Sequence, residues 1–77
     1  MEMRNVGLDK IDPNRRLVYP AETVQDMCQN IASNGLREPL VVELAGSRFR
    51  LVDGEKRWRA CKMLGFTTVP ANIVTGR

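Results

Sequence analysis

The 77-residue sequence contains no histidine, only two cysteines and no long apolar run. Without histidine the chain lacks the usual general base and a common zinc ligand. Cys–His proteolysis, Ser–His–Asp hydrolysis and a Cys/His zinc site are therefore excluded for the chain acting alone. Two cysteines do not make a disulfide framework in a chain of this kind. No stretch approaches the roughly 18 apolar residues that span a bilayer, and the first four residues (MEMR) carry no apolar signal segment. We expect a cytoplasmic protein with no membrane partner.

The chain is long enough for one domain, residues 1–77, and short enough to be one piece of a longer protein. Its 43% hydrophobic and 27% charged residues are typical of a globular domain. The formal net charge is +3, but the segment 48–62 alone carries six basic and two acidic residues. This basic window therefore holds +4 and the rest of the chain −1, so an anionic partner is expected at this segment.

The first half of the chain predicts a strand and a helix. Val6–Ile11 alternates loosely and favours a strand, which the turn signal Asp12–Asn14 ends. An irregular connection, 15–20, precedes a helix over Ala21–Asn34, with Gly35 as its left-handed cap. The apolar side of this helix spans about 140° of the helical wheel. It comprises Val24, Met27, Cys28, Ile31 and Ala32.

The second half predicts a hairpin, a helix and a last strand. Leu40–Leu44 and Arg48–Val52 flank the turn Ala45–Ser47, a helix follows over Glu55–Leu64, and Val69–Val74 is a short strand. Pro70 favours an edge strand or the start of a strand. The order β-α-β-β-α-β predicts an α/β (α+β) domain, with a small mixed sheet and two covering helices.

The turn at Gly54 is the strongest candidate site. It joins a strand to a helix N-terminus, where unpaired N–H groups and about half a positive charge attract anions. A glycine lets the backbone approach closely, and Lys56 and Arg57 add charge that suits phosphate. On the helix after this turn, an apolar arc of roughly 160° comprises Trp58, Ala60, Cys61 and Leu64. Arg57 falls near the middle of this arc, whereas Glu55, Lys56, Arg59 and Lys62 fall outside it. An inward charge must be paired, so its partner is either an internal carboxylate (Asp53 or Glu43) or a ligand phosphate.

The remaining candidates have plainer interpretations. Cys28 and Cys61 are expected as small core residues and Trp58 as a core anchor. Arg48 and Arg50 share one face of a strand, where they are solvated or touch a phosphate backbone. Arg15 and Arg16 are surface charges or ligand contacts in the irregular connection.

Four segments resemble the ParB N-terminal domain family, in order and with matching spacing. Residues 54–60 (GEKRWRA) are similar to the family's Gly-Glu-Arg-Arg-(Trp/Tyr)-Arg-Ala signature, with lysine for one arginine. Residues 30–42 (NIASNGLREPLVV) resemble its Ser-Ile-x-x-x-Gly segment and the Pro-hydrophobic run after it. Residues 11–14 (IDPN) and 64–71, which begin Leu-Gly and end Val-Pro-Ala, resemble its opening and closing stretches.

The resemblance implies the ParB/sulfiredoxin fold and a nucleoside triphosphate site, CTP in partition proteins, with Mg²⁺ and no covalent cofactor. The residues implied to bind nucleotide or phosphate are Gly54, Glu55, Lys56, Arg57, Gly35, Pro39, Arg15 and Arg16, and Glu55 is the implied catalytic and magnesium-positioning residue. The basic window and an adjoining domain would contact DNA, the window through Arg48, Arg50, Arg59 and Lys62. The resemblance also implies self-dimerisation, a possible partition ATPase as partner, and a nucleoid-associated location in chromosome or plasmid partition or in transcription regulation.

Two departures and two alternatives accompany this resemblance. The family's Gln-Pro-Arg motif is replaced by residues 14–19 (NRRLVY), which leaves the preferred base open, and glutamate stands where sulfiredoxin has its catalytic cysteine. At most, a slow nucleoside triphosphatase activity is expected.

The first alternative function is a ParB-like nuclease or a phosphoryl-transfer enzyme that uses Glu55 and Asp53. The second is an electrostatic DNA binder that needs no nucleotide.

Overall fold

A five-stranded mixed sheet forms one layer of the protein in the computed structural model, which describes residues 2–13 and 21–74. The strands are β1 (Glu2–Gly7), β2 (Ile11–Asp12), β3 (Leu40–Ala45), β4 (Arg48–Asp53) and β5 (Thr68–Val74). Their order across the sheet is β1-β5-β3-β4-β2. The β1–β5 and β3–β4 pairs are antiparallel, and the β3–β5 and β2–β4 pairs are parallel. The predicted mixed α+β sheet is thus confirmed.

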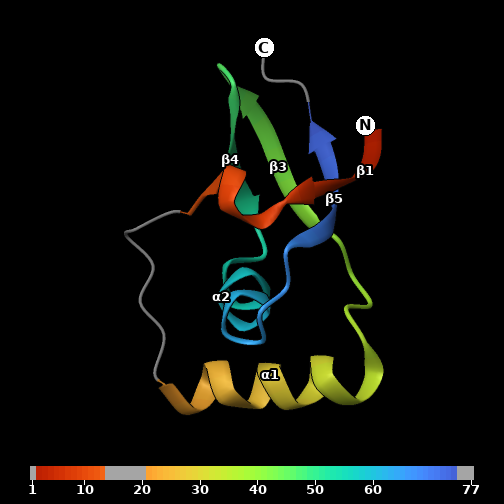
Figure 1. Ribbon diagram of the computed structural model, residues 1–77, viewed down its shortest axis with the longest axis vertical. Coiled ribbons are helices and arrows are strands. Elements are labelled where there is room, and N and C mark those ends of the chain that lie inside the picture. The colour runs from red at the N-terminus through yellow and green to blue at the C-terminus, as the bar shows by residue number, and fades with distance from the viewer. Residues whose placement is uncertain (1, 14–20, 75–77) are drawn as a thin grey trace.

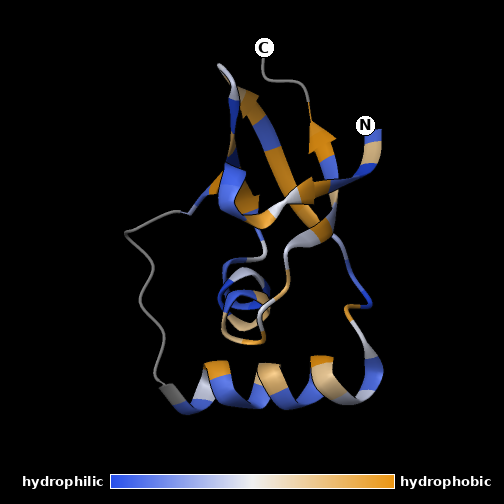
Figure 2. Cartoon of the chain, in the orientation of Figure 1, coloured by the Kyte–Doolittle hydropathy of each residue, from blue (hydrophilic) through white to orange (hydrophobic). Residues whose placement is uncertain are grey.

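Two helices lie on one side of the sheet (Figure 1), α1 over Ala21–Asn34 and α2 over Glu55–Met63. The helix α2 lies between the sheet and α1, and α1 packs against α2. Figure 2 shows the apolar residues of α1 on the side that faces α2. Val24 and Ile31 are buried there, whereas Ala32, predicted on the same side, is exposed. The apolar stripe of α1 is therefore narrower than predicted, because it covers one helix rather than a sheet.

The core joins all these elements around α2. Leu40, Val42, Val69 and Cys61 are the largest fully buried side chains. The inward residues of β5 alternate, with Val69, Ala71 and Ile73 buried. This period of two is what a sheet covered on one face requires.

The predicted strand Val6–Ile11 is wrong as a single element. The chain pairs as β1 only to Gly7, turns through a 3-10 helix at Leu8–Lys10, and resumes as β2 beside β4. The backbone N–H of Leu8 donates to the carbonyl of Thr67 at 2.9 Å. The turn carries the chain from one edge of the sheet to the other, so Val6, Leu8 and Ile11 all reach the core.

The hairpin and the last strand were predicted closely, with one refinement at Pro70. β5 lies inside the sheet, not at its edge. Its pairing with β3 begins at Ala71, however, so Pro70 has a partner strand only on the β1 side, opposite Asn5. A proline without an N–H is tolerated there because no ladder bond to β3 is lost.

Both cysteines line the contact between the helices, as predicted for small core residues. Cys61 is fully buried, and burial raises the pKa of its thiol. Cys28 is half-buried and its thiol donates to the carbonyl of Ala60 at 3.7 Å.

We expect Cys28 to react with a thiol reagent about tenfold faster than Cys61 in the native protein, since burial and a raised pKa keep Cys61 protonated and covered. The measurement is the time course of labelling with and without denaturant. The Cys28→Ala variant should lose the fast phase, and Cys61→Ala should keep it. Equal rates at the two thiols would contradict the packing described for α2.

Candidate functional site

Gly54 holds the turn between β4 and α2 in a conformation that few other residues adopt. Its φ is +107°, in the left-handed region, and the residue is buried. A Cβ placed there would lie 2.7 Å from Cδ2 of Leu40 and 3.4 Å from Nη2 of Arg57. Whether a ligand approaches the backbone at this glycine stays a prediction. The space beside Gly54 is filled by a core leucine and by the guanidinium of Arg57.

The N-terminus of α2 begins directly after this glycine. The first helical bond at the turn runs from the N–H of Trp58 to the carbonyl of Gly54 at 2.8 Å, and no described side chain caps the helix. The N–H groups of the first turn have no partner within an α-helix. These N–H groups and the side chains of Lys56 and Arg57 belong to the same N-terminal turn, so this end of the helix favours anions.

Glu55 lies differently from its prediction. It was expected outside the apolar arc, but its side chain is 2% exposed and Oε2 accepts a hydrogen bond from Nε of Arg59 at 2.9 Å. The ion pair with Arg59 offsets the cost of burying this carboxylate, because an unpaired buried charge would be costly. The pair fixes Arg59 along the helix and leaves Glu55 little access to a ligand.

Arg57 is half-buried beside the turn, as its inward position predicted. Its Nη2 lies 3.9 Å from Oδ2 of Asp53, and Nη1 lies 3.7 Å from Oε1 of Glu38. Nη1 also donates to the carbonyls of Glu38 and Pro39 at 3.4 and 3.5 Å. All four contacts are long and both carboxylates are largely exposed, so the guanidinium is positioned rather than tightly neutralised. Of the two predicted acids, Asp53 is a partner, whereas Glu43 pairs with Arg50.

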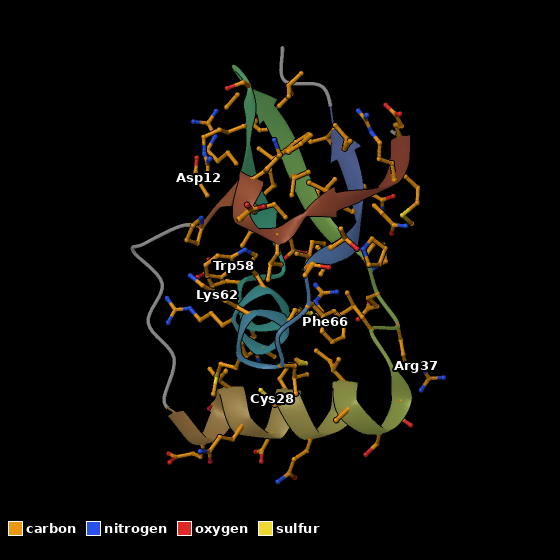
Figure 3. All side chains as sticks on the ribbon, in the orientation of Figure 1. Asp12, Cys28, Arg37, Trp58, Lys62 and Phe66 are labelled. Carbon is orange, nitrogen blue, oxygen red and sulfur yellow. The ribbon has the colours of Figure 1, made fainter. Side chains whose placement is uncertain are left out.

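A cavity of about 440 Å³ opens next to this turn, between α1 and the loop that leads to β3. Its described lining comprises Thr23, Asp26, Met27, Asn30, Ile31, Gly35, Arg37, Glu38 and Lys56. Thr23, Asp26 and Asn30 recur at the spacing of one helical stripe, so α1 contributes a polar wall. Figure 3 shows Arg37 projecting outward from the loop after α1.

The structure therefore brings most of the predicted phosphate-binding residues together. Gly35 and Lys56 line the cavity, and Pro39 and Gly54 contact Arg57. Gly35 has φ +76°, as its predicted cap role requires. Arg15 and Arg16 lie outside the described residues. The polar stripe of α1 and Arg37 were missed, because polar residues on a helix are usually only its solvated face; their spacing of three and four was the available signal.

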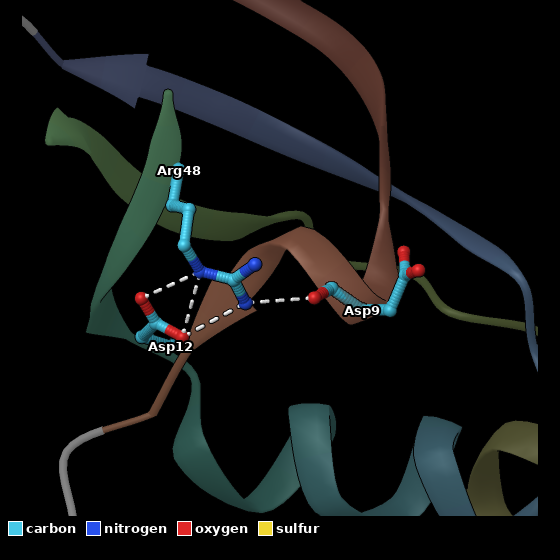
Figure 4. Close-up of polar contacts among 3 residues, drawn as sticks. All are labelled: Asp9, Asp12 and Arg48. Carbon is cyan, nitrogen blue, oxygen red and sulfur yellow. Dashed lines mark hydrogen bonds and ion pairs between the residues drawn. The ribbon is translucent and has the colours of Figure 1, made fainter. Parts of the chain in front are cut away.

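The predicted DNA-contact residues are mostly engaged in the protein's own ion pairs. Figure 4 shows Arg48 bonded to the Asp12 carboxylate, with Nη2 to Oδ1 at 2.9 Å, and to the backbone carbonyl of Asp9. The bond to Asp12 raises the pKa of Arg48. Arg50 pairs with Glu43 at 2.8 Å. Nζ of Lys62 lies 4.9 Å from the centroid of the Trp58 ring. Arg48 and Arg50 are exposed, as predicted, but much of the window's charge is locally balanced.

Metal and membrane features are absent from the described part of the chain. Within residues 2–13 and 21–74, no group of three or more acidic or cysteine side chains could hold a metal ion. Among the same residues, neither helix combines the length and apolar composition that crossing a bilayer needs.

The sheet, the glycine turn and the polar cavity define a small α+β domain whose candidate site lies where a strand passes into a helix N-terminus. The chain belongs to the ParB N-terminal domain family, whose model matches residues 1–76. A nucleoid occlusion protein of Geobacillus thermodenitrificans (strain NG80-2) is 38% identical over 76 residues. That alignment covers 94% of this chain and 27% of the relative, so the chain spans about a quarter of the relative's length.

Solved structures agree on the fold. A C-terminally truncated chromosome-partitioning protein ParB from Caulobacter crescentus, complexed with CTP-γ-S, matches with a TM-score of 0.87 at 24% identity, over 100% of this chain and 46% of that one. The same protein complexed to the centromeric parS site matches at 0.84 and 26% identity, over 94% and 40%. Sulfiredoxin from Arabidopsis thaliana matches at 0.87 and 23% identity, over 99% and 88%. The predicted ParB/sulfiredoxin fold is confirmed.

We expect Gly54→Ala to destabilise the protein by about 2 kcal/mol or more, because a left-handed φ is strained for alanine and its Cβ overlaps Leu40. Urea unfolding measures the loss. Gly46→Ala is the matched control: its φ is +66° and, apart from its two chain neighbours, no described residue lies within 4 Å of the new Cβ. If the two variants unfold at the same urea concentration, the close packing at Gly54 does not matter for stability.

Proposed function

We propose that this chain is the nucleoside triphosphate-binding module of a ParB-like partition or regulatory protein. The single observation that carries the proposal is the position of Arg57. Its guanidinium lies beside an uncapped helix N-terminus with only long contacts to its carboxylates, and the polar cavity opens next to it. A triphosphate needs several converging hydrogen-bond donors. This turn supplies backbone N–H groups and the planar guanidinium of Arg57.

The phosphates would lie across the turn at Gly54. The N–H groups of the first turn of α2 would meet one phosphate, and Arg57 would exchange its loose contacts with Glu38 and Asp53 for a bidentate contact. Lys56, in the cavity wall, would add a second cation. Because Glu38 and Asp53 are exposed, they can turn toward water when the phosphate takes their place.

The nucleoside would lie along α1. Thr23, Asp26 and Asn30 offer donors and acceptors in one row, and Met27 and Ile31 provide apolar surface for a base or sugar. CTP is the proposed nucleotide because the Caulobacter relative of the same fold was solved with CTP-γ-S. The cavity of about 440 Å³ is in the size range of small-molecule sites.

Magnesium would be held mainly by the phosphates. The described residues offer no cage of acidic groups, and Mg²⁺ commonly binds through phosphates with one or two carboxylates. Glu38 and Asp53, on either side of Arg57, fit such a supporting role better than Glu55, whose carboxylate is covered and paired with Arg59. This geometry also weakens the nuclease and phosphoryl-transfer alternative, which needs an accessible Glu55.

The wider role follows as part of the proposal. In a longer ParB-like protein the module would couple nucleotide binding to self-dimerisation on DNA, near the nucleoid and with a partition ATPase as a possible partner. The parS complex of the Caulobacter protein supports DNA as the partner of the whole protein. Here we expect the basic window to add only modest attraction, because Arg48, Arg50 and Arg59 already have acidic partners.

Calorimetric titration of CTP with Mg²⁺ tests the proposal. We expect saturable binding, weakened about tenfold or more in Arg57→Ala, since a charge-assisted bidentate contact is lost. Arg50→Ala is the matched control, because it also removes an arginine from an ion pair with a glutamate. Absence of binding at millimolar CTP, or equal weakening by the control, would refute the proposed site.

A second titration separates the two ends of the nucleotide. Asn30→Leu should weaken CTP and CMP by the same factor, because Asn30 lines the nucleoside end of the cavity. Arg57→Ala should weaken CTP much more than CMP, which lacks the outer phosphates. Gln29→Leu, an exposed neighbour outside the cavity lining, serves as control. If Asn30→Leu leaves CMP affinity unchanged, the nucleoside does not lie along α1.

A further inference from the structure

A second and larger cavity, of about 590 Å³, lies on another side of α2. Its described lining comprises Leu8, Asp9, Ile11, Asp12, Pro13, Arg48, Trp58, Lys62, Phe66 and Thr67. It shares no described residue with the cavity next to Gly54. At roughly 100° per helical residue, Trp58 projects about 160° away from Lys56 around α2. The two cavities therefore use different faces of the same helix, and a nucleotide in the first leaves the second open.

Trp58 lines the second cavity, and its indole N–H has no acceptor in the described part of the chain. The residue is 8% exposed, and its Nε1 is buried with no acceptor among the residues that the structure describes. A buried N–H without a partner is unfavourable, so such groups are uncommon in folded proteins. Trp58 is the only tryptophan in the chain. Since residues 2–13 and 21–74 supply no acceptor, a ligand in this cavity would supply one.

Lys62 supplies an unused positive charge beside the same ring. Its Nζ lies 4.9 Å from the Trp58 centroid, and the described residues give it no carboxylate partner. Figure 3 shows Trp58 and Lys62 projecting from the same side of α2. The other cation of the wall, Arg48, is already bound to Asp12, and the Asp9 carboxylate points away from Arg48 (Figure 4). In the described part of the wall, the donors without an acceptor are thus the ammonium of Lys62 and the indole N–H of Trp58.

We propose that this cavity binds a ligand with an aromatic or other apolar body and one carboxylate. The carboxylate contacts the ammonium of Lys62, and the apolar body lies against Trp58, Phe66 and Ile11. Nε1 is covered, so the indole N–H becomes a second donor to the ligand only when the wall moves on binding. The carboxylates of Asp9 and Asp12 in the same wall oppose a dianion, so a monoanionic carboxylate fits better than a phosphate.

The carboxylate can belong to a free small acid or to the C-terminal end of a peptide, since both present the same group on an apolar side chain. The probes are therefore 3-phenylpropanoate and the tripeptide Gly-Gly-Phe. The neutral counterparts are 3-phenylpropanamide and amidated Gly-Gly-Phe. Phenyl phosphate tests the preference for a single charge.

The indole N–H resonance of Trp58 is the readout, because one tryptophan gives one such signal. We expect a saturable shift with 3-phenylpropanoate, with Gly-Gly-Phe or with both, and the responding probe identifies the source of the carboxylate. The Lys62→Met variant keeps the apolar stem and should weaken binding about threefold to fivefold, the worth of an ion pair at an open site. Lys10→Met, an exposed lysine outside the described lining, should leave it unchanged.

Three results would overturn the proposal. They are equal binding of the amides and the acids, tighter binding of phenyl phosphate than of either carboxylate, and the lack of any saturable shift with both acids. Prior saturation of the first cavity with CTP should not displace the acid, so the outcome is independent of whether the chain binds nucleotide.

Discussion

The packing of Gly54 against Leu40 and Arg57 is the constraint on which the rest of the structure depends. Leu40 is fully buried in the first position of β3, and Arg57 is the third residue of α2. The left-handed bend at Gly54 lets β4 end and α2 begin without a side chain between these two residues. The hydrophobic core, through Leu40, and the charged turn, through Arg57, therefore meet at the position that a Cβ of residue 54 would occupy. The same conformation sets where α2 begins, and with it the position of the N–H groups of its first turn.

Electrostatics then separates structural charges from available ones. Arg48, Arg50 and Arg59 each have a carboxylate within 3 Å, so their positive charge is largely balanced within the protein. Arg57 has only contacts of 3.7 and 3.9 Å, and its carboxylates lie in solvent. A formal charge of +4 in one window thus overstates the attraction that the surface exerts. What the fold offers instead is a small number of donors held in place, which favours a compact anionic group over a long polyanion.

The sequence predicted the elements whose signals are local. The period of Ala21–Asn34 and the cap at Gly35 defined α1, and the turn after Ala45 defined the hairpin. It did not predict the break at Leu8–Lys10, because that turn depends on a bond to Thr67 and on pairing with β4, both distant in the chain. The burial of Glu55 was missed for a related reason: a helical wheel shows the angle of a side chain and not the elements packed around it. The wall formed by Asp26 and Asn30 was hidden because only the loop after α1 and Lys56 turn that solvated stripe into the side of a cavity.

The central position of α2 links stability to ligand binding. In so small a domain the surplus of folding free energy is a few kcal/mol, and one nine-residue helix touches the sheet, α1 and both cavities. A ligand that binds only the folded state adds RT ln(1 + [L]/Kd) to that surplus, about 2.7 kcal/mol at a hundredfold excess over Kd. Conversely, any loosening of α2 tilts the N–H groups beside Arg57 and the ring of Trp58 together. A change in affinity at either cavity therefore carries information about the site only when the stability of the same variant is known. This is the physical reason why substitutions on the helix surface are more informative than substitutions in its core.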